Sequence, residues 1–88
     1  MDDLGAPISY LVLERGADVF SADGEKVGDV AEVRADLGRD IFDGVVIRHG
    51  LLPGHNHVVP AEQVDEIYER GVVLKLAADE VESLPAPG

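Results

Sequence analysis

Cysteine and threonine are absent from this sequence, and their absence excludes several kinds of catalytic and metal-binding site. Without cysteine the chain has no disulfides, no thiolate metal sites and no cysteine nucleophile. The glycines form no phosphate-binding loop followed by Lys-Ser or Lys-Thr, and no carboxylate pair falls in a predicted apolar pocket. None of the serines has the sequence context of the strand-to-helix elbow that holds a serine nucleophile. They are Ser9, Ser21 and Ser83. We therefore expect a protein that is not an enzyme and carries no cofactor.

Basic residues are few, because only 7 Lys and Arg stand against 18 Asp and Glu, for a formal net charge of −11. Contacts to phosphates supply most of the affinity for DNA and RNA, so scattered basic residues disfavour nucleic acid as a partner. They disfavour anionic membrane surfaces for the same reason. The acids extend from Asp2 to Glu82, which predicts a broadly negative surface. A salt-adapted host is an alternative explanation of this acidity.

Long apolar runs are also missing. No stretch approaches the roughly 20 residues that span a bilayer, which argues against membrane insertion. The start Met-Asp-Asp-Leu lacks the positively charged region of a signal peptide, so we expect a cytoplasmic protein.

The chain has 88 residues, a length that predicts one domain with a thin core. We expect this domain to span residues 8–85, between a flexible N-terminal tail at 1–7 and a C-terminal tail at 86–88. Domains with small cores often need an additional source of stability, and without disulfides the source that remains is oligomerisation. The sequence therefore favours a homodimer.

Turn residues recur about every eight to twelve positions, which is the spacing of an all-β protein. The sharpest signal is Asp23-Gly24, which lies between apolar runs and predicts a type I′ hairpin turn. The alternation of Val72 and Leu74 with Val73 predicts a strand with one buried and one exposed face. The strand candidates are residues 8–13, 18–21, 27–35, 41–49, 57–59, 64–69 and 72–76.

Val27, Val30 and Val33 are spaced by three, which a flat strand cannot place on one face. We predict a β-bulge or strong bend within residues 28–32, because Gly28 is a poor helix residue. A short amphipathic helix is the alternative.

Two short helical turns complete the secondary-structure prediction. Residues 60–63 begin with Pro60 and carry an acid near the positive end of a helix dipole. Residues 79–84 pair Val81 with Leu84 before Pro85 ends the turn.

The order of glycines and aliphatic residues resembles the PRC-barrel family. Residues 16–30, Gly-Ala-Asp-Val-Phe-Ser-Ala-Asp-Gly-Glu-Lys-Val-Gly-Asp-Val, resemble the opening "G…V…dG…iG.V" pattern of these domains. Residues 44–47 resemble its "glvv" strand, and residues 58–64 resemble its "vPa..v" segment. The likeness covers about residues 16–85 and implies a small β-barrel with one or two short helical turns.

PRC-barrel domains form the cytoplasmic part of the photosynthetic reaction-centre H subunit and the C-terminal domain of a ribosome-maturation factor. Many others are short stand-alone proteins. The resemblance implies a domain that docks on other proteins and has no family-wide catalytic residue. This chain has neither the membrane helix of the H subunit nor the preceding barrel of the maturation factor, so neither specific function transfers. We expect a protein-interaction or scaffolding module whose protein partner is unknown.

All three histidines lie close together in the sequence, at His49, His55 and His57. On an extended segment His55 and His57 share a face, and a hairpin would bring His49 across to them. A three-nitrogen zinc or nickel site is therefore an alternative function. The spacing matches no established metal signature, so a polar loop is the simpler interpretation. A pH-sensitive loop is a further alternative.

Two groups of acidic residues are weaker candidates for a binding site. Asp36, Asp40 and Asp43 lack EF-hand spacing and enclose Arg39, so we interpret them as solvated turn acids. The second group is interpreted as an exposed face, with a patch for a basic partner as the alternative. It comprises Glu62, Asp65, Glu66 and Glu69.

The segment 8–13 is apolar on both faces, and one thin barrel cannot bury both. A partner or a second copy of the chain would cover the exposed face. The alternative is a fully internal strand beneath the C-terminal helix. Together with an apolar loop before the second histidine, the predicted interaction surface comprises Ile8, Tyr10, Leu11, Val12, Leu13, Leu51 and Leu52.

Overall fold

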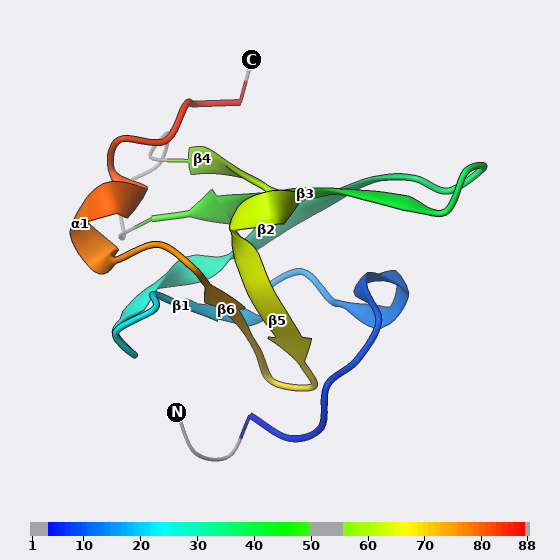
Figure 1. The fold of residues 1–88 in the computed structure, drawn as a ribbon, viewed down its shortest axis with the longest axis horizontal. Coiled ribbons are helices and arrows are strands. Elements are labelled where there is room, and N and C mark those ends of the chain that lie inside the picture. Colours follow the sequence, from blue (N-terminus) through cyan, green and yellow to red (C-terminus); the bar gives the residue numbers. More distant parts are fainter. Residues whose placement is uncertain (1–3, 50–55, 88) are drawn as a thin grey trace.

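The structure, a computed structural model, describes residues 4–49 and 56–87 and is built mainly from one β-sheet (Figure 1). Among the described residues no helix is long and apolar enough to cross a membrane. The strands are β1 (Asp18–Phe20), β2 (Lys26–Asp36), β3 (Ile41–Arg48), β4 (Asn56–Pro60), β5 (Val64–Tyr68) and β6 (Gly71–Leu74). The helical turns are η1 (Tyr10–Val12), η2 (Ala61–Gln63) and α1 (Ala78–Val81).

The sheet has six strands in the order β4-β3-β2-β1-β6-β5. Neighbours pair antiparallel except for β1 and β6, which run parallel. The prediction of a mainly β fold is confirmed, and six of the seven strand candidates coincide with observed strands. The sheet is open, with β4 and β5 as its two edges, so this arrangement does not show the closed barrel implied by the PRC-barrel resemblance.

The strand predicted at residues 8–13 is wrong, because this segment forms η1. Ser9 Oγ accepts a hydrogen bond from Leu11 N at 3.1 Å, and Leu13 N donates to Tyr10 O at 3.3 Å. A serine that bonds its own backbone in this way offers the chain a local alternative to a strand ladder. Pairing with the sheet ends at Ile8, whose N–H donates to Ile67 O at 2.9 Å.

The bulge predicted in β2 is confirmed. The pairing of β2 with β3 shifts register between Val30 and Glu32. A second irregularity, in the pairing of β2 with β1, skips Val27. With both irregularities Val27 and Val30 are buried, and Val33 packs against the core. The extra residue bends the strand, as bulges do.

The β1–β2 hairpin is present, but its turn is not type I′. That turn needs a positive φ at both central residues, whereas only Gly24 (φ 88°) has one and Asp23 does not. The buried hydroxyl of Ser21 donates to Asp23 and accepts a hydrogen bond from Glu25 N at 3.2 Å. This bond from Ser21 lowers the pKa of Asp23. Ser21 therefore stabilises the turn through these hydrogen bonds.

Both predicted helical turns are confirmed. Pro60 precedes η2, and Val81 of α1 is fully buried with Leu84 packed beside it. The core that they cover comprises Val19, Val27, Val30, Val45, Ile47, Val59, Ile67, Val72, Leu74 and Val81.

The predicted exposure of one face of the last strand is wrong, because Val73 is buried. This residue pairs in register with Phe20, whose aromatic side chain lies beside it on the same face. Successive residues of β6 are thus buried on both faces of this inner strand.

Candidate functional site

The clearest candidate site lies where η1 meets the end of the β2–β3 hairpin. The rings of Tyr10 and Phe42 stack with centroids 5.2 Å apart and planes inclined by 21°. The Tyr10 hydroxyl donates a hydrogen bond of 2.5 Å to Asp40 Oδ1. This bond, with burial and the negative charges of Asp40, Asp36 and Asp43, raises the pKa of Tyr10 to about 12. The two contacts fasten η1 to the hairpin.

The tip of the β2–β3 hairpin is a tight turn that positions the carboxylate of Asp40, the acceptor of the Tyr10 bond. Asp40 N donates to Leu37 O at 3.4 Å, and Asp40 itself has a φ of 55°. The left-handed region is unfavourable for most residues but is tolerated by aspartate. Arg39 lies 3.8 Å from Asp36, as expected for charged residues on a solvated turn.

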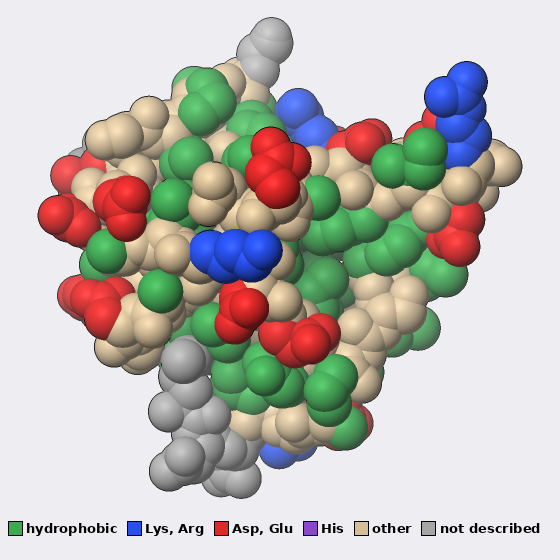
Figure 2. Space-filling model, in the orientation of Figure 1, with side chains coloured by type: hydrophobic (Ala, Val, Ile, Leu, Met, Phe, Trp, Pro, Cys, Tyr) green, Lys and Arg blue, Asp and Glu red, His purple; other side chains and the backbone are tan. Residues whose placement is uncertain are grey.

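Four large apolar side chains are exposed at this end of the molecule. Leu11 and Val12 on η1 are 59% and 61% exposed, and Leu37 and Ile41 on the hairpin are 71% and 44% exposed. Because Tyr10 joins η1 to the hairpin, these four side chains belong to one region, which we call the arm surface. Figure 2 shows hydrophobic side chains gathered in the hollow beside the projecting β2–β3 hairpin.

The predicted interaction residues thus separate into inward and outward groups. Ile8, Tyr10 and Leu13 pack against the core, whereas Leu11 and Val12 point outward. Leu51 and Leu52 lie outside the described residues. Sequence reasoning missed Leu37 and Ile41, although two large aliphatic residues flanking a Gly-Arg-Asp turn are a signal that could have found them.

A groove runs next to the end of η1. It has a volume of 510 Å³ and is lined by Leu13 and Arg15 on one side and by residues 31–33 of β2 on the other. The groove gives the region a shallow concave part beside the outward-pointing Leu11 and Val12. The groove itself has a mixed lining that includes the charged Arg15 and Glu32. The exposed apolar residues of the arm surface are what is typical of a surface that contacts another macromolecule.

The two described histidines lie near each other at the far end of the sheet. The ring centroids of His49 and His57 are 5.7 Å apart. His57 Nδ1 lies 3.0 Å from Leu84 O, and because a carbonyl only accepts, His57 donates from Nδ1 and keeps Nε2 free of this bond. His55 lies outside the described residues. Within residues 4–49 and 56–87 no three His, Asp or Glu side chains are grouped so as to hold a metal ion.

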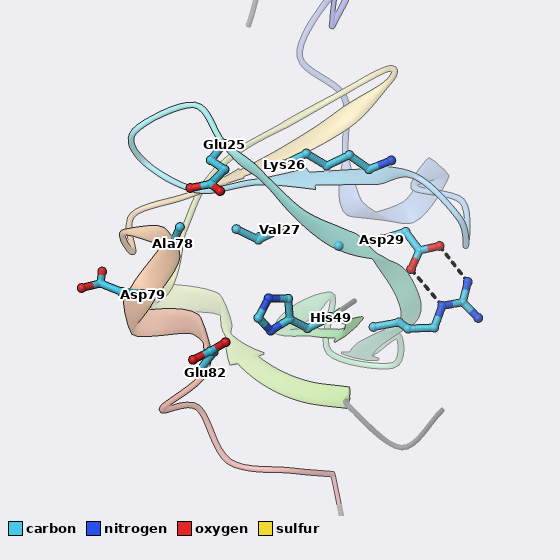
Figure 3. A pocket seen from close by; sticks show the side chains of 10 residues that line it. Glu25, Lys26, Val27, Asp29, His49, Ala78, Asp79 and Glu82 are labelled. Carbon is cyan, nitrogen blue, oxygen red and sulfur yellow. Dashed lines mark hydrogen bonds and ion pairs between the residues drawn. The ribbon is translucent and has the colours of Figure 1, made fainter. Parts of the chain in front are cut away.

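His49 also lines a cleft of 880 Å³ between the start of β2 and α1 (Figure 3). Arg48 binds Asp29 through two hydrogen bonds, of 2.7 and 3.0 Å, which lower the pKa of Asp29. Lys26 pairs with Asp18 at 3.0 Å. Both cations of the cleft are thus held by acids of the chain. The other charged residues lining it are Glu25, Asp79 and Glu82.

The acidic stretch predicted on one face is exposed, as expected. Asp65 and Glu66 lie on the edge strand β5, with Glu62 and Glu69 beyond its ends. These side chains face solvent and leave β5 with charges along its length.

Comparison with family models matches residues 13–82 to a family described as "Uncharacterized protein conserved in bacteria (DUF2171)". No curated protein matches the chain. Since the match covers most of the sequence, the chain belongs to this family.

Proposed function

We propose that this member of the DUF2171 family is a non-enzymatic protein-interaction or scaffolding module of the PRC-barrel type. What supports the PRC-barrel assignment is the order of turns and strands. Gly24 lies in the first hairpin turn with a positive φ, and Gly28 packs so closely on β3 that a Cβ would lie 2.1 Å from Arg48 O. These are two of the glycines that carry the resemblance. A cytoplasmic location is part of the same proposal.

The observation that carries the interaction role is the arm surface. Leu11 and Val12 are more than half exposed on a turn whose neighbours Tyr10 and Leu13 are packed. Isolated exposed leucines are ordinary, but here two pairs of exposed apolar residues lie on η1 and on the hairpin, which the Tyr10 contacts with Asp40 and Phe42 hold together. A preorganised apolar surface binds with less loss of side-chain entropy than a flexible one.

The first partner proposed for this surface is a second copy of the chain. A domain with a small core gains stability from self-association, and cysteine is absent. Each copy carries a formal charge of −11, so the two copies repel each other at low salt. Self-association through apolar side chains should therefore strengthen as salt screens that repulsion.

Light scattering after size exclusion tests this role at high micromolar concentration. We expect a dimer for the native chain and a shift toward monomer for Leu11→Asp with Val12→Asp. Replacing the same two residues by serine should act in the same direction without adding charge, whereas Ala22→Asp, an exposed residue in the β1–β2 turn, should leave the mass unchanged. A native chain that stays monomeric even in 1 M salt contradicts self-association.

Metal binding by the histidines is the second candidate, favoured by the 5.7 Å separation of the His49 and His57 rings. The bond from His57 Nδ1 to Leu84 O leaves Nε2 able to coordinate zinc or nickel. Zinc titration should show weaker binding in His49→Ala with His57→Ala than in the native chain. Equal binding by the two proteins removes the metal from consideration.

A further inference from the structure

The outer edge of β4 has backbone groups that point away from the sheet and pair with no strand among the described residues. Within the described residues β4 pairs only with β3, where Val58 lies opposite Val46. The N–H of Val58 points outward, because it donates to Pro85 O at 2.8 Å. Backbone groups alternate along a strand, so the N–H of Asn56 and the carbonyl of Val58 point the same way.

This edge lacks the charges that usually protect edge strands. β4 consists of Asn56, His57, Val58, Val59 and Pro60, with no Asp, Glu, Lys or Arg in a chain that is otherwise strongly acidic. Charged side chains on an edge strand discourage pairing with another strand, and β5 has them. β4 therefore depends on a cover.

The cover is the segment that follows α1. It contributes one backbone hydrogen bond among the described residues, from Val58 N to Pro85 O, and the contact of His57 Nδ1 with Leu84 O. Proline has no N–H, so Pro85 cannot return a bond to the Val58 carbonyl. The cover is therefore attached on one side only, and Figure 1 shows it leaving α1 as a coil that passes β4.

We propose that the β4 edge is a strand-pairing site for β4 of a second copy, available when residues 85–87 move away. Antiparallel pairing centred on Val58 lets each Val58 donate to and accept from Val58 of the other copy. The Pro60 carbonyl takes no part in this pairing, because Pro60 caps η2 and its carbonyl accepts the first bond of that turn. The contact between the two β4 strands, which we call the seam, contains no like charges, although each chain has a formal net charge of −11. Such pairing replaces the covering bond of each copy, from Val58 N to Pro85 O, by two reciprocal bonds between the Val58 residues.

This site is separate from the arm surface and does not rest on the proposed function. Both chains compared in its test therefore carry Leu11→Asp with Val12→Asp, because these changes remove association through η1. The test compares a chain that ends at Leu84 with the full-length chain, by light scattering over a range of concentrations. Ending at Leu84 removes Pro85 but keeps the apolar side chain that packs on the core.

We expect dimerisation of the shortened chain to be about 30-fold tighter, the effect of two fewer covering bonds to break, one in each copy. Val58→Glu places like charges opposite each other at the centre of the seam and should restore the monomer. Val58→Lys, which places two positive charges opposite each other at the same point, is a second variant with the same expectation, and circular dichroism establishes that each variant is folded. Amide exchange at Val58 should be slower in the shortened dimer than in the shortened Val58→Glu monomer.

A folded shortened chain that stays monomeric overturns the proposal. A dimer that persists unchanged in folded Val58→Glu and Val58→Lys does so as well, since the seam then lies elsewhere. Equal dimerisation of the full-length and shortened chains overturns the role of residues 85–87 as a cover.

Discussion

At the β5 edge, residues 4–8 run alongside the strand, with Ile8 N donating to Ile67 O, Glu69 N to Ala6 O and Arg70 N to Leu4 O. At the β4 edge, by contrast, the described part of the C-terminal segment contributes one backbone bond, from Val58 N to Pro85 O. The N-terminal segment is anchored further by η1 and the Tyr10 contacts. Two edges of one sheet are thus protected to different degrees, since β5 has both charged side chains and the cover with more backbone bonds among the described residues.

The largest effect is expected from disrupting the inner side of β4. Gly44 of β3 has a φ of 146°, and a Cβ there would lie 2.2 Å from Val59 O. Gly44→Ala should therefore lower the free energy of unfolding by about 4 kcal/mol, from backbone strain and the clash together. Urea denaturation measures this value.

A matched glycine separates these two causes. Gly16 also has a positive φ, of 89°, but a Cβ added there would have no atom within 4 Å. Gly16→Ala should cost only about 1 to 2 kcal/mol, from the backbone conformation alone. Equal losses at both positions would show that the close approach of β3 and β4 is unimportant.

The next effect compares the two covers directly. Removing residues 1–7 deletes the acceptors Leu4 O and Ala6 O and the bond from Ala6 N to Glu69 Oε1. At about 1 kcal/mol for each bond, the loss of stability should be about 3 kcal/mol. Ending the chain at Leu84 deletes one backbone bond and should cost about 1 kcal/mol. Similar losses in urea denaturation would contradict the difference between the edges.

The smallest effect concerns the anchor of the N-terminal cover. The folded-state pKa of Tyr10 is raised to about 12 from an ordinary value of 10.0, so its contribution to stability is present below pH 10 and is lost as the pH rises toward 12. The native chain should therefore lose more stability than Tyr10→Phe over this interval. Denaturation at several pH values measures it, and parallel profiles would contradict the Tyr10–Asp40 bond.

Much of the strand pattern could be predicted, because turn residues and β-branched runs act locally. Val27, Val30 and Val33 even indicated the bulge in β2. The segment 8–13 could not be assigned from its apolar pattern, since Ser9 closes a local turn and η1 then packs on Phe42, which is distant in the sequence. The outward direction of Leu11 and Val12 depends on that packing.

The sequence by itself determined a small, acidic, mainly β domain without cysteine chemistry, because composition, turn residues and strand periodicity are local properties of the chain. Only the tertiary structure decided that the sheet is open, that its edges are covered by the two terminal segments, and that Leu37 and Ile41 share an end of the molecule with η1. These features depend on long-range pairing, in which residues meet that no local pattern connects.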